Sequence, residues 1–520
     1  MATRNSGMTA VEDVQDDVEK GHVKPTDPAP VVNDLDPNAD ETSSTTSVPE
    51  TVDGAEAQLK YLGWHDWWKC VKLVLKPWGL SMFLICIPFA WVSHWKVESW
   101  GHEAQFALCF LSIMSLQNIF ESCGDQLAWR TGKDLGEFIC ITFKNCVEAT
   151  LALILLKGCH LRLLQSTIIG VVVLHLLLVQ GTAFFIGGSK TVKQKLHDHQ
   201  VAINPSLLMV GVLGVVLPTA FFAALDRGDN TTVGESPSTP LVGDAVRGWI
   251  LKTSHAVSIM LLVVYVISRV HRHIWPLPQK VSNRLPQFLK RFLPADTSAT
   301  TGDPARKKVC RCGCVCLPVV NDPPVSKEDV YLIPIALCAF FIVVSIVVMS
   351  VTAEFLVESI DPVRERYHIQ SEFFGLILLP LVSFLPEAAL AFCSFMPTLQ
   401  MTTPPEPEAR GTPIDSSIQF TLWWMPIVIL IGWWIGKPIH LLFDYFEVAL
   451  LLGTCFLVNY VTADGETNFA EGFTMFTFYA MIATAAWFYP GQSQVGYMLS
   501  CPGSVAAAVA SGVQNALVFH

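Results

Sequence analysis

The chain has little charge. Only 15% of its 520 residues are Asp, Glu, Lys or Arg, whereas 51% are apolar. A soluble globular protein carries roughly 25% charged residues. Apolar runs recur along the sequence, and their lengths match the roughly 17–25 residues that a helix needs to cross a bilayer. The composition therefore excludes an ordinary soluble fold and predicts an all-α polytopic membrane protein.

Motifs for catalysis and for energy coupling are also missing. The sequence contains no glycine-rich phosphate-binding loop and no nucleophile motif, which argues against an enzyme and against an ATP-driven pump. No cofactor is expected, and no nucleic-acid partner. The fifteen cysteines show no spacing typical of a disulfide framework. Most of them are interpreted as small buried apolar residues.

The first 58 residues lack the apolar segment of a cleaved signal peptide. Thirteen acidic and three basic residues fall within 1–56, so this segment carries nearly all of the chain's net charge of −11. A segment rich in Pro, Ser, Thr and Asp, with almost no aromatic residues, is typical of disorder. We expect 1–58 to be a disordered acidic cytosolic tail, either a solvating segment or a regulatory one that contacts the rest of the protein or a partner.

Eleven apolar segments predict about eleven transmembrane helices. They lie near residues 79–95, 104–122, 136–157, 164–187, 206–225, 246–270, 330–357, 371–397, 415–435, 445–462 and 469–489. Basic residues precede the first segment and follow the fourth and sixth, which places these connectors in the cytosol. The connector after the fifth segment is acidic and carries a glycosylation sequon at Asn230, which is used only in a lumen. The amino terminus is then cytosolic and the carboxy terminus lumenal.

A long basic connector, 271–329, divides the chain into two similar parts. Residues 59–270 hold an N-terminal helix and five further spans, and residues 330–490 hold five spans, followed by a lumenal tail, 491–520. Five spans per set force opposite orientations, so the sets are expected to be inverted repeats with a binding site between them. We expect the bilayer to be the protein's environment.

Four cysteines alternate within the basic connector: Cys310, Cys312, Cys314 and Cys316. Cysteines beside a polybasic patch are candidates for palmitoylation. A plain loop of reduced cysteines is an equal alternative, and a thiolate metal site ranks behind both because the spacing is not C-x-x-C.

Two glutamates interrupt apolar segments, one in each half. Glu148 lies in the third segment and Glu387 in the eighth. A carboxylate within a membrane span costs several kcal/mol, so such residues are rare and usually functional. Low dielectric raises the pKa of a carboxylate, so such a group can bind either a proton or a cation. The pair predicts a membrane-embedded ion site.

The residues around both glutamates resemble known signatures. Asn145 to Glu148, followed by Leu161 to Ser166, is similar to the first signature repeat of the calcium/proton exchangers of the calcium/cation antiporter superfamily. Glu354 to Ile360 and Leu378 to Glu387 resemble the second repeat. The likeness continues through Ser416-Ser417-Ile418-Gln419, Gly436-Lys437-Pro438, Val458-Asn459-Tyr460 and Trp487 to Pro490. It spans roughly 65–490, and the fungal vacuolar members are the most similar in character.

The resemblance implies a cation/proton antiporter, most simply Ca²⁺/H⁺ exchange into an acidic organelle such as the vacuole, by alternating access. It assigns metal or proton binding to Glu148 and Glu387. It assigns neutral ligand oxygens to Asn145, Ser416, Ser417 and Gln419, and an accessory acidic pair to Asp125 and Glu354. Ca²⁺ prefers 6–8 oxygen ligands with carboxylates among them.

The sequence departs from the family at several site positions. Phe384 and Ala388 stand where the family has Asn and His, and Leu174-His175 stands where it usually has Ser-Asn. Lys144 and Asp415 each replace a Gly. The site keeps its charge and loses at least two neutral ligands. Monovalent cation/proton exchange and a transport-inactive paralogue with a regulatory role are therefore the alternatives to calcium exchange.

Two of the substituted positions leave their own alternatives open. Lys144 either pairs with Glu148 one helical turn away or extends its amine to the membrane surface. His175 is either a hydrogen-bonded core histidine or a proton-linked group, because an unperturbed histidine titrates near 6.5.

Overall fold

The structure is a computed structural model that describes residues 59–61, 67–74, 82–131, 133–189, 193–196, 198–226, 242–274, 330–386, 388–389, 408–409, 412–501 and 503–510. All of them belong to one structural unit, Ala57–His520. Several earlier expectations concern residues outside these ranges: the acidic tail, Asn230, Glu387 and the four cysteines of the basic connector.

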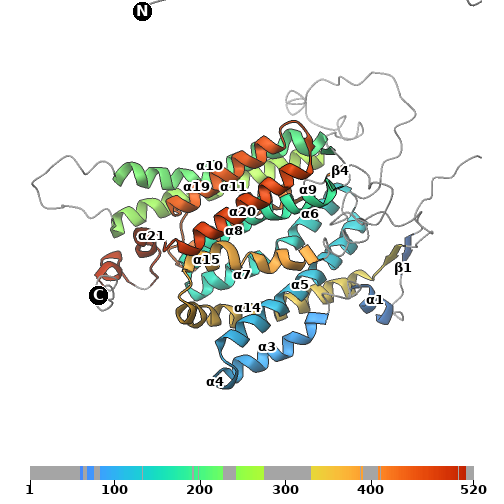
Figure 1. Ribbon diagram of the computed structural model, residues 1–520, viewed down its shortest axis with the longest axis horizontal. Coiled ribbons are helices and arrows are strands. Elements are labelled where there is room, and N and C mark those ends of the chain that lie inside the picture. The colour runs from blue at the N-terminus through green and yellow to red at the C-terminus, as the bar shows by residue number, and fades with distance from the viewer. Residues whose placement is uncertain are drawn as a thin grey trace, which may run out of the picture. The chain divides into compact units, whose positions relative to one another are not determined.

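Helices dominate the described part of the first half (Figure 1). This follows from the apolar composition, because a backbone in lipid must satisfy its hydrogen bonds within its own segment. The bounds are α1 Trp67–Val74, η2 Met82–Ile85, α3 Cys86–Trp95, α4 Val97–Trp100, α5 His102–Thr131, α6 Lys133–Lys144, α7 Cys146–Gly158, α8 Leu161–Val173, η3 Leu174–Val179, α9 Gln180–Gly187, α10 Asp198–Asp226 and α11 Asp244–Ile274.

The second half is built in the same way. Its elements are α14 Ile335–Tyr367, α15 Ser371–Phe373, η6 Phe374–Leu378, α17 Thr412–Gln419, η7 Phe420–Trp424, α18 Met425–Trp434, α19 Tyr445–Val461, α20 Phe469–Phe488 and α21 Ser493–Met498. The segments η3, η6 and η7 are π-helical turns inserted into longer helices.

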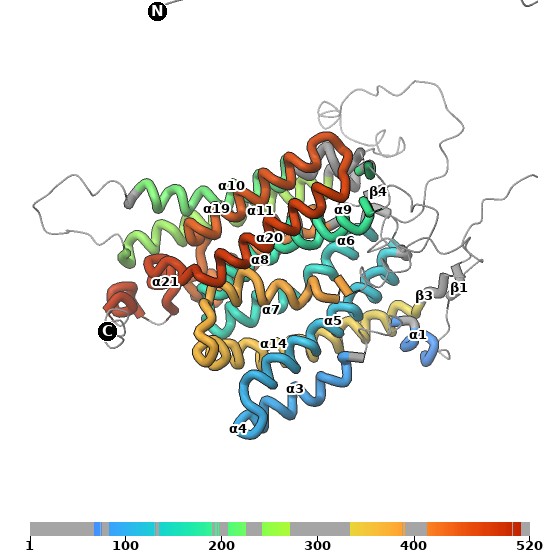
Figure 2. Tube along the Cα trace, in the orientation of Figure 1, coloured from blue at the N-terminus to red at the C-terminus, as the bar shows by residue number. Residues whose placement is uncertain are grey.

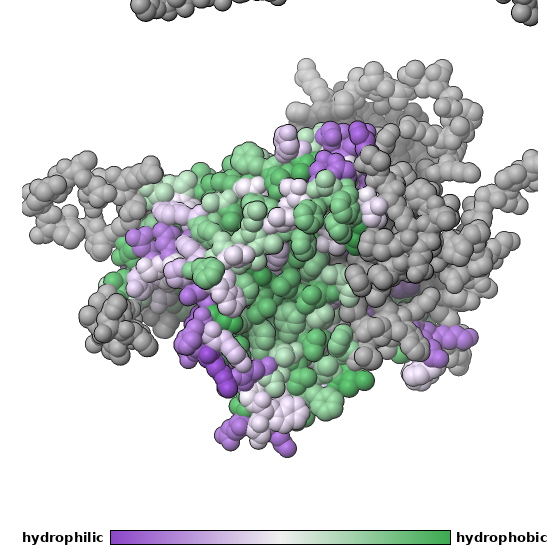
Figure 3. Space-filling model, viewed as in Figure 1, coloured by the Kyte–Doolittle hydropathy of each residue, from purple (hydrophilic) through white to green (hydrophobic). Residues whose placement is uncertain are grey.

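The predicted class, an all-α membrane protein, is confirmed. Among the described residues, six helices are long and apolar enough to cross a membrane, and a seventh is obtained if α6 and α7 count as one bent span. The surface in Figure 3 is hydrophobic over the middle of the helices, and hydrophilic residues gather toward their ends. Some boundaries were wrong, since α5 continues to Thr131 instead of ending near 122 and α14 continues to Tyr367 instead of ending near 357.

Short strands tie together the connectors at one end of the helices, here called the sheet end. Strand β1 (Leu59–Tyr61) pairs in parallel with β3 (Val330–Leu332). Strand β2 (Gln194–Leu196) pairs in parallel with β4 (Glu408–Ala409) and antiparallel to β5 (Glu466–Thr467). All five strands lie in segments that the sequence places on the same side of the membrane.

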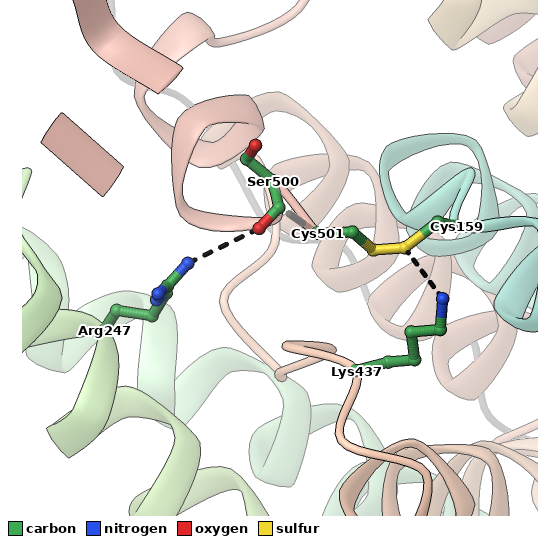
Figure 4. The surroundings of a disulfide bond; sticks show 5 residues. All are labelled: Cys159, Arg247, Lys437, Ser500 and Cys501. Carbon is green, nitrogen blue, oxygen red and sulfur yellow. Dashed lines mark hydrogen bonds between the residues drawn. A yellow bond between two sulfur atoms is a disulfide. The ribbon is translucent and has the colours of Figure 1, made fainter. Parts of the chain in front are cut away.

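The opposite set of connectors is held by a disulfide, and we call it the disulfide end (residues 157–162, 368–372, 435–447 and 489–501). Cys159, just after α7, is bonded to Cys501, 342 positions later. Figure 4 shows Lys437 directed at this bond, with its Nζ 3.4 Å from Cys159 Sγ. Arg247 in turn donates to the carbonyl of Ser500 at 3.4 Å. The interpretation of the cysteines as single buried residues was therefore wrong for this pair.

The two halves pack closely through glycines. A side chain at Gly170 of α8 would collide with the carbonyl of Leu376, and one at Gly375 of η6 would meet the Cβ of Ser166 at 2.5 Å. The absence of Cβ atoms thus lets α8 and η6 approach backbone to backbone, as small residues do in membrane helix pairs. Helices α3, α5 and α14 pack together on the other side of α7 (Figure 2).

Candidate ion-binding site

The site forms where the third span bends. Helices α6 and α7 meet at an angle of 48°, and Asn145 between them has φ −83° and ψ 6°. This backbone region is sparsely populated and common at functional sites. The Asn145 carbonyl still accepts from the amide of Ala149 at 3.0 Å, so Asn145 begins the first turn of α7.

The side chain of Asn145 connects the two halves of the protein. Its Nδ2 donates to Gln419 Oε1 at 2.9 Å and to the carbonyl of Ser416 at 3.3 Å, both on α17. The Gln419 amide in turn donates to Thr142 Oγ1 at 2.8 Å. Asn145 Oδ1 is buried and receives no hydrogen bond from any described residue. An oxygen in that state is available to a cation.

Glu148 occupies the first turn of α7, where the helix dipole stabilises negative charge. It is 2% exposed. Its Oε1 lies 3.8 Å from His175 Nε2, which belongs to the π-helical turn η3. His175 Nδ1 lies 3.0 Å from the carbonyl of Val171, and because a carbonyl only accepts, Nδ1 carries the proton. In the neutral ring the Nε2 lone pair then faces Glu148.

The two serines contribute differently. Ser416 and Ser417 are both buried. Ser416 offers its carbonyl to Asn145, as described above, whereas the Ser417 hydroxyl donates to the carbonyl of Pro413 at 3.0 Å. The π-helical turn η7 follows directly after Gln419, so π-helical turns adjoin the site from both halves. Such turns occur frequently at functional sites.

The counterpart of this site in the second half is visible only in part, because Glu387 lies outside the described residues. Phe384, three positions earlier, is 8% exposed. A buried phenyl ring thus stands where the first half has the Asn145 amide. No group of three His, Cys, Asp or Glu side chains is gathered within the described part of the chain.

Asp125 and Glu354 do not lie together. Asp125 accepts from Cys140 Sγ at 3.3 Å, and Cys338 near the start of α14 contacts the carbonyl of Cys123 at 3.5 Å. Glu354 is sixteen residues beyond Cys338, about 24 Å along a helix. There its Oε1 pairs with Lys157 Nζ at 3.0 Å, and both side chains are largely exposed. The two acids occupy equivalent positions at opposite ends of the molecule.

Lys144 closes α6, and its carbonyl accepts from Gln117 Nε2 at 3.0 Å. Glu148 follows on α7. The two residues lie on either side of the bend at Asn145, and the pairing of their side chains stays a prediction.

Sequence reasoning missed a cluster of charged residues at the disulfide end. Arg162 at the start of α8 lies 2.9 Å from Glu372 Oε1 through Nε and 2.9 Å from Asp444 Oδ2 through Nη2. Its Nη1 is 3.7 Å from Glu447 Oε2. The first half provides the cation and the second half provides all three carboxylates. The only signal in the sequence was Arg162 within the first signature repeat.

Each carboxylate of this cluster has further donors. Asp444 caps α19 through the amide of Phe446 at 2.9 Å and accepts from the Tyr489 hydroxyl at 2.6 Å. Burial, followed by the hydrogen bond to Asp444, raises the pKa of Tyr489, so its hydroxyl keeps the proton that it donates. Glu447 accepts from Ser166 Oγ at 2.6 Å. The cluster therefore locks α8, α15, α19 and the segment after α20 together.

A helical bundle of this kind, with a buried carboxylate at a bent span, is typical of a membrane transport protein. The chain belongs to the sodium/calcium exchanger protein family, which matches residues 102–272 and 337–488. It is a transporter-family protein and not an enzyme.

Similar proteins agree with this assignment. A vacuolar calcium ion transporter of Cryptococcus neoformans var. grubii is 28% identical over 84% of this chain and 78% of its own length. A Ca²⁺/H⁺ antiporter of Synechocystis is 26% identical over 79% of this chain and 97% of its own. Among solved structures, native YfkE aligns with a TM-score of 0.53 at 18% identity and covers 78% of this chain and 100% of its own. The last comparison supports the fold alone.

Proposed function

We propose that the protein is a secondary cation/proton antiporter in which Glu148 and Glu387 bind either a cation or protons. The observation that carries this proposal is the start of α7: Glu148 is a buried carboxylate, and Asn145, three residues earlier at a bend held by Gln419, has a buried oxygen with no donor among the described residues. Burying charge and an unsatisfied oxygen together costs free energy. A bound cation or proton offsets that cost.

Exchange follows if the two ions compete for the same groups. Cation binding requires an ionised Glu148, whereas a bound proton neutralises Glu148. The site therefore holds either a cation or a proton, whichever side of the membrane it faces. Alternating access then couples their movements in opposite directions, as in other transporters built from inverted repeats. Ca²⁺ is the first candidate cation because several relatives bear that ion in their names.

We propose the membrane of an acidic organelle, the vacuole, as the location, with the amino terminus in the cytosol. Relatives from two fungi and a plant are named as vacuolar transporters. The disulfide between Cys159 and Cys501 supports this orientation, since disulfides persist in lumenal compartments and are rare in the cytosol. Both cysteines lie in segments that the sequence assigns to the lumen.

The test uses purified full-length protein in vesicles with an acidic interior and a pH-sensitive dye inside. Adding Ca²⁺ outside should alkalinise the interior, whereas vesicles without protein should not respond. K⁺ and Na⁺ added in parallel distinguish monovalent exchange. Alkalinisation by none of these ions would overturn the proposal in favour of a transport-inactive paralogue, which the phenyl ring of Phe384 at a ligand position favours.

A further inference from the structure

The disulfide between Cys159 and Cys501 forms part of the wall of a cavity. Both cysteines line this cavity, and both are partly exposed. Its volume is about 580 Å³, within the roughly 300–1,000 Å³ typical of pockets that hold small molecules. The other walls come from the start of α8, the last turns of α14, and α21 with the residues that follow it. A small solute at the disulfide end can therefore reach the two sulfur atoms.

The two sulfur atoms differ in their surroundings. Lys437, in the connector between α18 and α19, donates from Nζ to Cys159 Sγ at 3.4 Å (Figure 4). In the part of the chain that the structure describes, Lys437 forms no ion pair with a carboxylate, and no side chain donates to Cys501 Sγ. Arg247 lies on the Cys501 side and is directed at the carbonyl of Ser500 instead of at the sulfur. The positive charge next to the bond thus belongs to Cys159.

We propose that this disulfide is a thiol-exchange site with a fixed direction, in which a small thiol becomes bonded to Cys501 while Cys159 is released as a thiolate beside Lys437. The inference concerns a covalent modification at the disulfide end, and it does not depend on the antiport proposal.

The exchange follows the ordinary chemistry of thiols. The thiolate of the small molecule attacks Cys501 Sγ and forms a new S–S bond, while the bond to Cys159 breaks and its electron pair stays on Cys159 Sγ. A neighbouring lysine stabilises a thiolate, and the sulfur that forms the more stable thiolate is the better leaving group. Attack by a second thiolate on the small molecule's sulfur would release Cys501 and an oxidised small-molecule disulfide. Two thiols are then oxidised as the protein disulfide is reduced.

Opening the bond releases the end of α7 and leaves the carboxy-terminal segment attached elsewhere. Cys159 is the residue that ends α7, with φ 64° and ψ 25°, a left-handed conformation that is uncommon for residues other than glycine. The carboxy-terminal segment is also held on α11, where Arg247 donates to two of its carbonyls and Asp244 accepts from the amide of Val505 at 3.1 Å. Exchange therefore removes a covalent restraint from the helix that carries Glu148.

The experiment locates the thiol adduct by peptide mass spectrometry. Free thiols of the purified full-length protein are first blocked with N-ethylmaleimide, which is then removed. A short incubation with reduced glutathione follows, and newly released thiols are captured with iodoacetamide. Most of the glutathione should be found on Cys501 and most of the iodoacetamide label on Cys159. This distribution is measured in the parent protein, so it does not depend on the folding of any variant.

Two lysine variants test the cause of the preference. Lys437→Met keeps an apolar side chain of similar length and removes the charge, so the preference for Cys501 should be lost and the bond should open more slowly. Lys157→Met is the matched control, because Lys157 precedes Cys159 in the same connector and pairs with Glu354 instead of with the sulfur. It should keep the preference. Equal adducts on both cysteines, an unchanged preference in Lys437→Met, or an adduct that forms only in denaturant would overturn the inference.

Discussion

The glutamate-bearing segments of the two halves differ in what stands one turn before the acid. In the first half, Asn145 bonds to Gln419 across the molecule. In the second half, the same step before Glu387 is occupied by the buried ring of Phe384. One half therefore offers a polar frame for an ion and the other offers apolar packing. We propose on this basis that the first half, with Glu148 and Asn145, carries most of the recognition of the cation.

Neutralising either glutamate should have the largest effect on transport, because each half of the proposed site depends on its own acid. Glu148→Gln and Glu387→Gln should each abolish exchange, because an amide binds neither a proton at physiological pH nor a cation by charge. Vesicle alkalinisation measures the loss. Glu365→Gln, on the exposed end of α14, is the control and should exchange normally. Full exchange in either site variant would show that the acids are only structural.

Replacing Arg162 tests how much the ion pairs between the two halves at the disulfide end stabilise the fold. Arg162→Gln leaves Glu372, Asp444 and Glu447 without their shared cation, which should destabilise the fold by about 3–5 kcal/mol. Thermal unfolding in detergent measures the change. Lys157→Gln breaks the exposed pair with Glu354, and a surface pair contributes about 0–1 kcal/mol. Equal shifts in the two variants would contradict the assigned role of the cluster.

Asn145→Leu makes the first half resemble the second. Gln419 Oε1 loses its donor, and an unsatisfied buried acceptor costs about 1–3 kcal/mol. Half-saturating cation concentrations should rise as well. Asn459→Leu is the control for stability, because Asn459 donates to the weak acceptor Cys455 Sγ on its own helix, at 3.5 Å. If Asn145→Leu is as stable and as active as the parent protein, Asn145 is not part of the ion-binding site.

Phe384→Asn makes the reverse change and should have the smallest effect. One added oxygen ligand worth about 1 kcal/mol corresponds to roughly fivefold tighter Ca²⁺ binding. The half-saturating Ca²⁺ concentration in vesicles measures it, and Phe384→Leu controls for loss of the ring. If the parent protein is inactive and Phe384→Asn with Ala388→His is active, the transport-inactive interpretation holds instead.

Local patterns in the sequence predicted the helices, because apolar runs of neighbouring residues locate the spans. Asn145 and Glu148 were assigned to the site from their resemblance to a family signature, and the structure places both at the start of α7. The contact between Glu148 and His175 was not foreseen, since the π-helical turn that directs His175 leaves no simple periodic signal. The end of α14 was misplaced because Glu358, Asp361 and Arg364 read as a loop, whereas the helix continues beyond its apolar part.

Long-range contacts at the disulfide end had no local signal. Cys159 and Cys501 are separated by 342 positions, and nothing near either residue identifies its partner. Arg162 finds its carboxylates in two separate connectors of the other half. Each acid alone resembles an ordinary residue at a helix start, where Asp444 serves as a cap. Only the folded arrangement brings them together.

The central claim is that one buried site is shared by a cation and protons. Calorimetric titration of the purified protein with Ca²⁺, repeated in two buffers that differ in ionisation enthalpy, counts the protons released per bound cation. The account predicts proton release on binding of the ion in the parent protein and its reduction in Glu148→Gln. Cation binding with the same heat in both buffers, and thus without proton release, would contradict it.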